Sequence, residues 1–148
     1  LHVAAAYSLT RQSREARPDE YTKRVPQAST LASRVMRWGG VLLLVFIVYH
    51  ILHFTTGTFS PGGPFVEGDV YHNVVQSFHV WWVALFYMVS MVFLGLHLYH
   101  GAWSSARTLS IAGNSPNPLH HRISAVIGIA VWLGFTLVPL AVLLGLVG

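Results

Sequence analysis

The chain has 148 residues, of which 53% are hydrophobic and only 9% are charged, and its formal net charge is +4. A soluble domain carries about 25% charged residues, so this composition excludes an ordinary soluble protein. The chain has no cysteine, which excludes disulfides, iron–sulfur ligation and thioether-linked haem. Its apolar runs are continuous, whereas the strands of a membrane β-barrel alternate apolar and polar residues. We therefore expect an all-α fold, a polytopic transmembrane helical bundle.

The first element is an apolar stretch at about residues 1–10, which contains His2. It has neither a charged start nor a convincing signal-peptide cleavage pattern. We interpret it as the end of a preceding spanning helix, and we expect residues upstream of Leu1 in the native protein. Residues 1–148 then form a single membrane domain.

Three complete spanning helices are expected next, at about residues 32–55, 74–108 and 122–146. No charged residue lies between Arg37 and Glu67, or between Asp69 and Arg107. About 20 apolar residues cross a bilayer, so these runs are long enough. Pro139 should kink the last helix, because its ring removes a backbone donor and clashes with the preceding turn.

The charges between the helices predict the orientation. All nine Lys and Arg residues lie in or beside the first polar stretch, 11–37, and the third, 110–121, whereas the middle stretch, 56–76, holds two acids and no base. By the positive-inside rule, the basic stretches face the cytoplasm, and the middle stretch and the C-terminus lie outside the cell (inner) membrane. This explains the positive charge without nucleic acid. The basic stretches are also a candidate docking face for a soluble partner.

Histidines in the apolar segments are the candidate functional residues, because an imidazole in hydrocarbon is costly. They are His2, His50, His53, His97 and His100. At a rise of about 1.5 Å per residue, His2 and His97 lie about 13 and 15 Å from the arginine at the inner edge, and His50 lies about 20 Å from it. His2 and His97 are therefore level, on helices that run the same way, and can bind one planar ligand from two sides. His50 has no clear partner at its level.

Two imidazoles that face each other across a flat, apolar cofactor in a helical bundle indicate bis-histidine haem b. Zinc is less favoured, because it takes four ligands and this interior supplies neither Cys nor carboxylate. His97 is favoured over His100 because Gly101, one turn further on, leaves room for the macrocycle. His53 and His100 are alternative ligands or supporting residues. The alternative is that these histidines only hydrogen-bond between helices, which is worth about 0.6 kcal/mol on average.

Five segments are distinctive in combination: LTRQSREARP at 9–18, ASTLASR at 28–34, FIVYH at 46–50, DVYHNVV at 69–75 and LHLYHGAWS at 96–104. Together and in this order they resemble the five-helix, di-haem cytochrome b subunit of succinate dehydrogenase/fumarate reductase. They resemble, in turn, that family's loop after the second helix, the start and the ligand segment of its third helix, the approach to its fourth helix, and the fourth helix itself.

The resemblance implies that His2, His50 and His97 are the haem ligands of the second, third and fourth helices. His2 and His97 would bind the iron of the inner haem, and His50 that of the outer haem, whose other ligand lies on a first helix absent from this sequence. It also implies a membrane anchor that is not catalytic alone. An iron–sulfur subunit, supplied by a succinate-oxidising flavoprotein subunit, would pass electrons through it to quinone in the membrane lipid.

Two alternative functions remain open from the sequence. One is the cytochrome b subunit of another membrane oxidoreductase, such as a hydrogenase or a nitrate reductase. The other is a haem-free scaffold or transport subunit whose histidines relay protons. If quinone binds near the inner haem, its candidate contacts are Trp38, Ser104 and Arg107.

Overall fold

A computed structural model of the chain describes residues 1–16, 31–109 and 118–148. Parts of the two basic stretches, 17–30 and 110–117, lie outside these described residues. The elements in chain order are α1 (His2–Glu15), α2 (Leu31–His50), the π-helical segment η1 (Ile51–Thr55), α3 (Val70–Phe78), α4 (Trp81–Thr108) and α5 (Pro118–Leu143). The described residues contain no strand, which confirms the all-α class.

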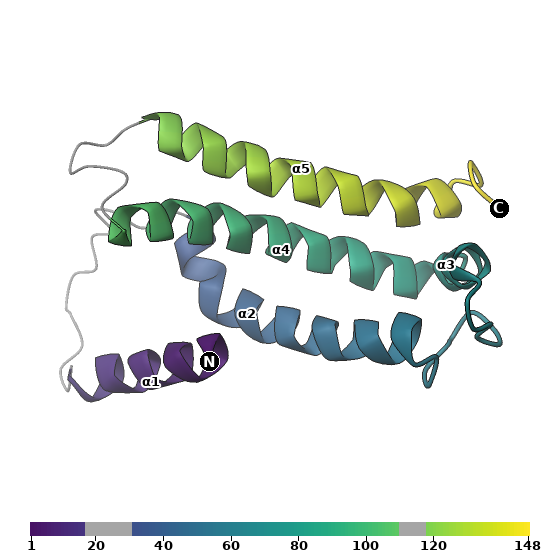
Figure 1. Cartoon of the computed structure of the whole chain (residues 1–148), viewed down its shortest axis with the longest axis horizontal. Helices are drawn as coiled ribbons and strands as arrows, with labels where there is room; N and C mark the ends of the chain where they lie inside the picture. The colour runs from purple at the N-terminus through teal and green to yellow at the C-terminus, as the bar shows by residue number, and fades with distance from the viewer. Residues whose placement is uncertain (17–30, 110–117) are drawn as a thin grey trace.

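Three helical segments are long and apolar enough to cross a membrane: Val35–Thr55, Trp81–Thr108 and Leu119–Leu143. They lie side by side in one layer with α4 in the middle, in contact with α2 on one flank and α5 on the other (Figure 1). Neighbouring helices run in opposite directions, whereas α1 lies apart from the layer and runs in the same direction as α4 (Figure 1). The expected bundle of three spanning helices is therefore confirmed.

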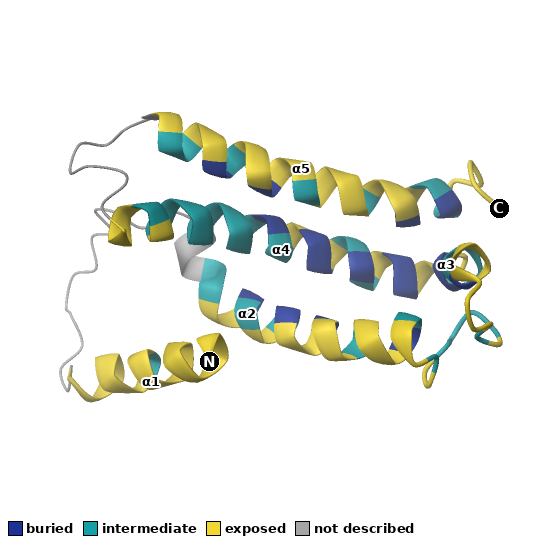
Figure 2. Cartoon of the chain, in the orientation of Figure 1, coloured by how far each residue is buried: buried dark blue, intermediate teal, exposed yellow. Residues whose placement is uncertain are grey.

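Burial is concentrated on α4, and the outward faces of α2 and α5 are exposed although they are apolar (Figure 2). Val83 and Ala84 of α4 are fully buried, whereas Ile47 of α2 and Phe135 of α5 are more than half exposed. A soluble protein rarely exposes apolar surface of this extent. The exposure is that of a protein whose outer surface meets lipid.

Two glycines allow α4 and α5 to approach closely. A Cβ atom on Gly128 would lie 2.6 Å from the carbonyl oxygen of Gly95, and one on Gly95 would lie 2.9 Å from that of Gly128. Small residues at such crossings are typical of membrane helices, whose association depends on packing rather than on the exclusion of water. The contact fixes the position of α5 against the middle of α4.

The segment 74–108, expected as one helix, is divided between α3 and α4. Val80 separates the two with an extended backbone (φ −81°, ψ 101°), and α3 crosses the end of the bundle instead of extending α4 (Figure 1). The short helix has its own start, because the Asp69 side chain accepts a hydrogen bond from the backbone N–H of His72 at 2.9 Å. Such a cap satisfies a donor that the first turn leaves unpaired.

The other helix ends differ from expectation by a few residues. α1 continues beyond residue 10 to Glu15, whose carboxylate pairs with Arg11 at 2.7 Å one turn away. α5 continues through Pro139, whose ring is buried, and ends at Leu143. Gly145 follows with a positive φ of 67°, a conformation that commonly terminates helices.

Candidate functional site

The structure brings His2 and His97 together. Their ring centroids lie 6.0 Å apart with an interplanar angle of 81°, and they come from α1 and from the half of α4 furthest from α3. A metal–nitrogen bond is about 2 Å, so two imidazoles that bind one iron from opposite sides have ring centres roughly 6 Å apart. The spacing is compatible with two imidazoles on one metal ion, and it is also that of an edge-to-face ring contact.

The surroundings of His97 also fit a haem. Its Nδ1 atom is buried and has no hydrogen-bond partner among the described residues, and the same is true of Nδ1 of His100, so this feature does not separate the two. A Cβ atom on Gly101, one turn further along the same helix face, would meet nothing within 4 Å. That open space would leave room for a flat cofactor beside His97. His100 instead lies beside Trp103, with ring centroids 6.2 Å apart.

His50 lies at the end of α2 and borders a groove of about 1010 Å³ between α2, α4, α5 and the segment around α3. Cofactor and ligand sites occupy about 300–1,000 Å³, so the groove has the size of a large one. Its walls are mostly apolar, with Phe46 from α2, Phe135 from α5 and the carboxylate residue Glu67 near the α3 end. The His50 side chain is exposed to it, and its Nδ1 atom lies 3.4 Å from the hydroxyl of Tyr87.

His53 has the opposite environment. It is only 1% exposed and stacks on Phe54 with ring centroids 4.1 Å apart. Its Nδ1 atom lies 3.1 Å from the hydroxyl of Tyr87 and its Nε2 atom 2.8 Å from that of Ser77. Because both ring nitrogens are hydrogen-bonded, neither is free for a metal, which favours a supporting role for His53. The hydrogen bonds join η1 to α3 and α4.

Ser77 and Tyr87 are residues that the sequence analysis did not select. Both are polar side chains inside a run without charges, and both are buried, at 1% and 6% exposure. A buried hydroxyl requires a partner, so a search for uncharged polar residues beside the histidines could have found them. The π-helical turn η1, which holds His53, is a further feature often found at functional sites.

The quinone candidates lie on α2 and α4 at the end opposite α3. Trp38 is 80% exposed. The hydroxyl of Ser104 donates to the carbonyl of Gly101 at 3.3 Å, and the guanidinium of Arg107 lies over the ring of Trp103, 5.3 Å from its centroid. The structure thus links Arg107 to Trp103 rather than to Trp38.

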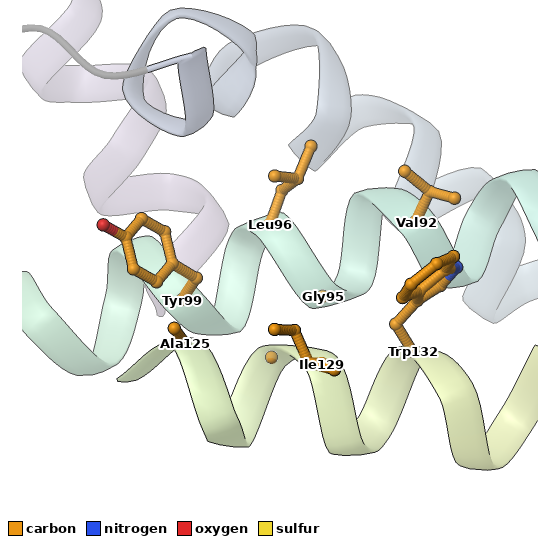
Figure 3. A pocket seen from close by; sticks show the side chains of 8 residues that line it. Val92, Gly95, Leu96, Tyr99, Ala125, Ile129 and Trp132 are labelled. Atoms are coloured by element: carbon orange, nitrogen blue, oxygen red, sulfur yellow. The ribbon is translucent and has the colours of Figure 1, made fainter. Parts of the chain in front are cut away.

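A smaller hollow of about 250 Å³ lies between α4 and α5, beside the glycine contact (Figure 3). Tyr99, Ile129 and Trp132 line it, and its walls are almost entirely apolar. The hydroxyl of Tyr99 instead pairs with Nδ1 of His121 at 3.2 Å. The hollow is below the usual size of a ligand site and offers no group that would recognise a polar ligand.

The family model that describes the succinate dehydrogenase/fumarate reductase transmembrane subunit matches residues 10–106. This range covers well over half of the chain and includes His50 and His97, whereas His2 precedes it. Comparison with curated proteins finds no match, and comparison with solved structures finds none. The chain therefore belongs to the family of succinate dehydrogenase/fumarate reductase transmembrane subunits, and it is a multi-pass membrane subunit of such a complex.

Proposed function

We propose that this chain is the haem b membrane anchor of a succinate dehydrogenase, which relays electrons between an iron–sulfur subunit and membrane quinone. The observation that carries the proposal is the 6.0 Å separation of the His2 and His97 rings. These rings come from two helices that do not otherwise pack on each other. Haem b, when bound, supplies a one-electron carrier.

The chain's own residues supply ligands, position and an apolar surrounding. His2 and His97 would hold the inner haem, and His50 would supply one ligand to the outer haem from the wall of the groove. The buried core beside the groove is mostly aromatic or aliphatic, and most of the groove's own walls are apolar as well. A low dielectric around a haem is one of the means by which a protein sets its potential.

The distribution of charge supports the orientation and the docking face. The described arginines of the spanning layer and of α1 lie at the end opposite α3: Arg11, Arg14, Arg37, Arg107 and Arg122. Glu67 and Asp69 lie at the α3 end. By the positive-inside rule, the α3 end faces outward and the arginine end faces the cytoplasm. The iron–sulfur subunit, and through it the flavoprotein subunit, would dock at the arginine end.

The proposal is tested on the purified complex with His97→Ala. We expect a reduced-minus-oxidised visible spectrum with one haem lost and the other retained, because only the inner site loses a ligand. The matched control is His100→Ala, three residues away on the same helix, which should retain both haems. Retention of both haems in His97→Ala would reject the ligand assignment.

Two further observations test the wider function. A wild-type complex with no haem b signal would reject the cytochrome role in favour of a haem-free subunit. Co-purification with a flavin-bearing subunit that oxidises succinate supports the succinate dehydrogenase assignment, and co-purification with a different catalytic subunit would contradict it.

A further inference from the structure

Four polar side chains form a continuous chain of hydrogen bonds beside the groove. Ser77 of α3 pairs with Nε2 of His53 at 2.8 Å, and Nδ1 of His53 pairs with the Tyr87 hydroxyl at 3.1 Å. The same hydroxyl lies 3.4 Å from Nδ1 of His50. Ser77, His53 and Tyr87 are buried, whereas His50 is exposed to the groove. His50 is therefore the exposed end of this hydrogen-bond chain, and Tyr87, although mostly buried, also lines the groove.

The direction of the hydrogens along this chain decides what His50 can do. A neutral imidazole has one N–H and one lone pair. If Tyr87 donates to Nδ1 of His50, the hydrogen of His50 is on Nε2, which then cannot bind a metal. If Nδ1–H of His50 donates to the Tyr87 oxygen, Nε2 keeps its lone pair. Nε2 makes no hydrogen bond within the described part of the chain.

The second direction can be continued through every link. Tyr87 O–H donates to Nδ1 of His53, and Nε2–H of His53 donates to the oxygen of Ser77. In each hydrogen bond, one atom then donates and the other accepts. Because Ser77, His53 and Tyr87 come from separate elements, the packing of these elements keeps the hydrogen-bonded side chains together.

We propose that Tyr87 is a positioning residue for His50: backed by His53 and Ser77, it accepts the Nδ1–H of His50 and keeps Nε2 free to bind a haem iron in the groove. The inference rests on the proposed role of His50 as a haem ligand. A metal-bound histidine usually donates its other N–H to such a partner, which fixes the ring and raises its basicity, and loss of the partner costs about 10–100-fold in affinity or activity.

The test is Tyr87→Phe in the complete complex, followed by a redox titration of the haem absorbance. Lowering the basicity of the imidazole weakens its bond to ferric iron more than its bond to ferrous iron, so the midpoint potential of the His50 haem should rise. A preferential loss of about tenfold in ferric binding corresponds to a rise of about 59 mV. The inner haem, held by His2 and His97, should titrate as in the wild type.

Tyr49→Phe is the matched control. The Tyr49 ring packs in the same cluster, with its centroid 5.3 Å from that of His53 and 6.0 Å from that of Tyr87. Its hydroxyl is buried and has no hydrogen-bond partner among the described residues. The substitution therefore removes one tyrosine hydroxyl without breaking any of the hydrogen bonds between Ser77, His53, Tyr87 and His50. We expect no shift in the midpoint potential. An equal shift in both variants would overturn the proposal, because it would trace the effect to packing.

Two more variants separate this inference from the proposed function. His50→Ala should lose one haem, and retention of both would reject His50 as a ligand together with the inference. Loss in His50→Ala with an unchanged potential in Tyr87→Phe would overturn the inference alone. Ser77→Ala should shift the potential in the same direction as Tyr87→Phe but less, and no shift would overturn the part assigned to Ser77.

Discussion

His50 and His53 lie three residues apart, yet their ring nitrogens have opposite surroundings. His53 is enclosed and hydrogen-bonded at both nitrogens, whereas His50 borders the groove and shares only the Tyr87 hydroxyl. An imidazole in an apolar interior is stable when its polar atoms are satisfied. The structure therefore distinguishes a histidine that stabilises the fold from one that is available to a ligand.

The enclosure of His53 predicts a stability effect. His53→Leu keeps an apolar side chain of moderate size but leaves the hydroxyls of Ser77 and Tyr87 without that partner. We expect a loss of about 1–3 kcal/mol in the free energy of unfolding, measured by circular dichroism of the detergent-solubilised protein in increasing SDS. His72→Leu, on the exposed side of α3, is the control and should unfold as the wild type. Equal stability of both variants would contradict the structural role.

The sequence predicted the relative positions of residues where the regular rise of a helix is enough to place them. The helical rise placed His2 and His97 at one level, and the structure brings their rings to 6.0 Å. It could not find the partners of His53, because Ser77 and Tyr87 are 24 and 34 residues away in the chain. Their proximity depends on how α3 turns across the bundle, which no local pattern records.

The contact between α4 and α5 depends on two glycines, Gly95 and Gly128, which have no side chains where the helices cross. In Gly128→Ala the new Cβ would lie 2.6 Å from the Gly95 carbonyl oxygen, so the helices must separate. We expect a destabilisation of about 1–3 kcal/mol, the usual cost of overpacking, visible as a lower SDS midpoint of unfolding.

Gly134→Ala is the control for this crossing. It lies on the same helix, is exposed, and its Cβ would meet nothing within 4 Å. It should not lower the unfolding midpoint. Equal midpoints for Gly128→Ala and Gly134→Ala would show that the close approach is not what holds α5 in place.

The spanning helices were predictable because a charge-free run of sufficient length has few other stable conformations in a membrane. The break between α3 and α4 was not. Residues 74–80 include Gln76, Ser77 and His79 but no charged residue, glycine or proline, so the sequence holds no strong signal that would end the helix there. The extended backbone of Val80 makes the break, and the Asp69 cap sets the start of α3; hydropathy registers neither conformation.

At the scale of the whole molecule, the separation of charge between the two ends predicts which side each end faces. The chain has no cysteine, so a single introduced thiol is a unique label. Thr58→Cys, in the exposed segment at the α3 end, should react with a membrane-impermeant maleimide on intact cells. Ser13→Cys, exposed on α1, should react only after permeabilisation. The reverse pattern would contradict the orientation.

The isolation of α1 has a consequence for how the subunit matures. No α1 side chain is buried, and in the described part of the chain no helix packs against α1 apart from the ring contact between His2 and His97 (Figure 2). Under the proposed pairing, the iron between His2 and His97 fastens this helix, and part of the binding free energy of the cofactor becomes folding free energy. Within the described residues, haem would therefore be the link that ties α1 to the spanning layer. Cofactor binding and the placing of this helix would then be one coupled event, so that loss of either ligand should loosen α1 as well as release the haem.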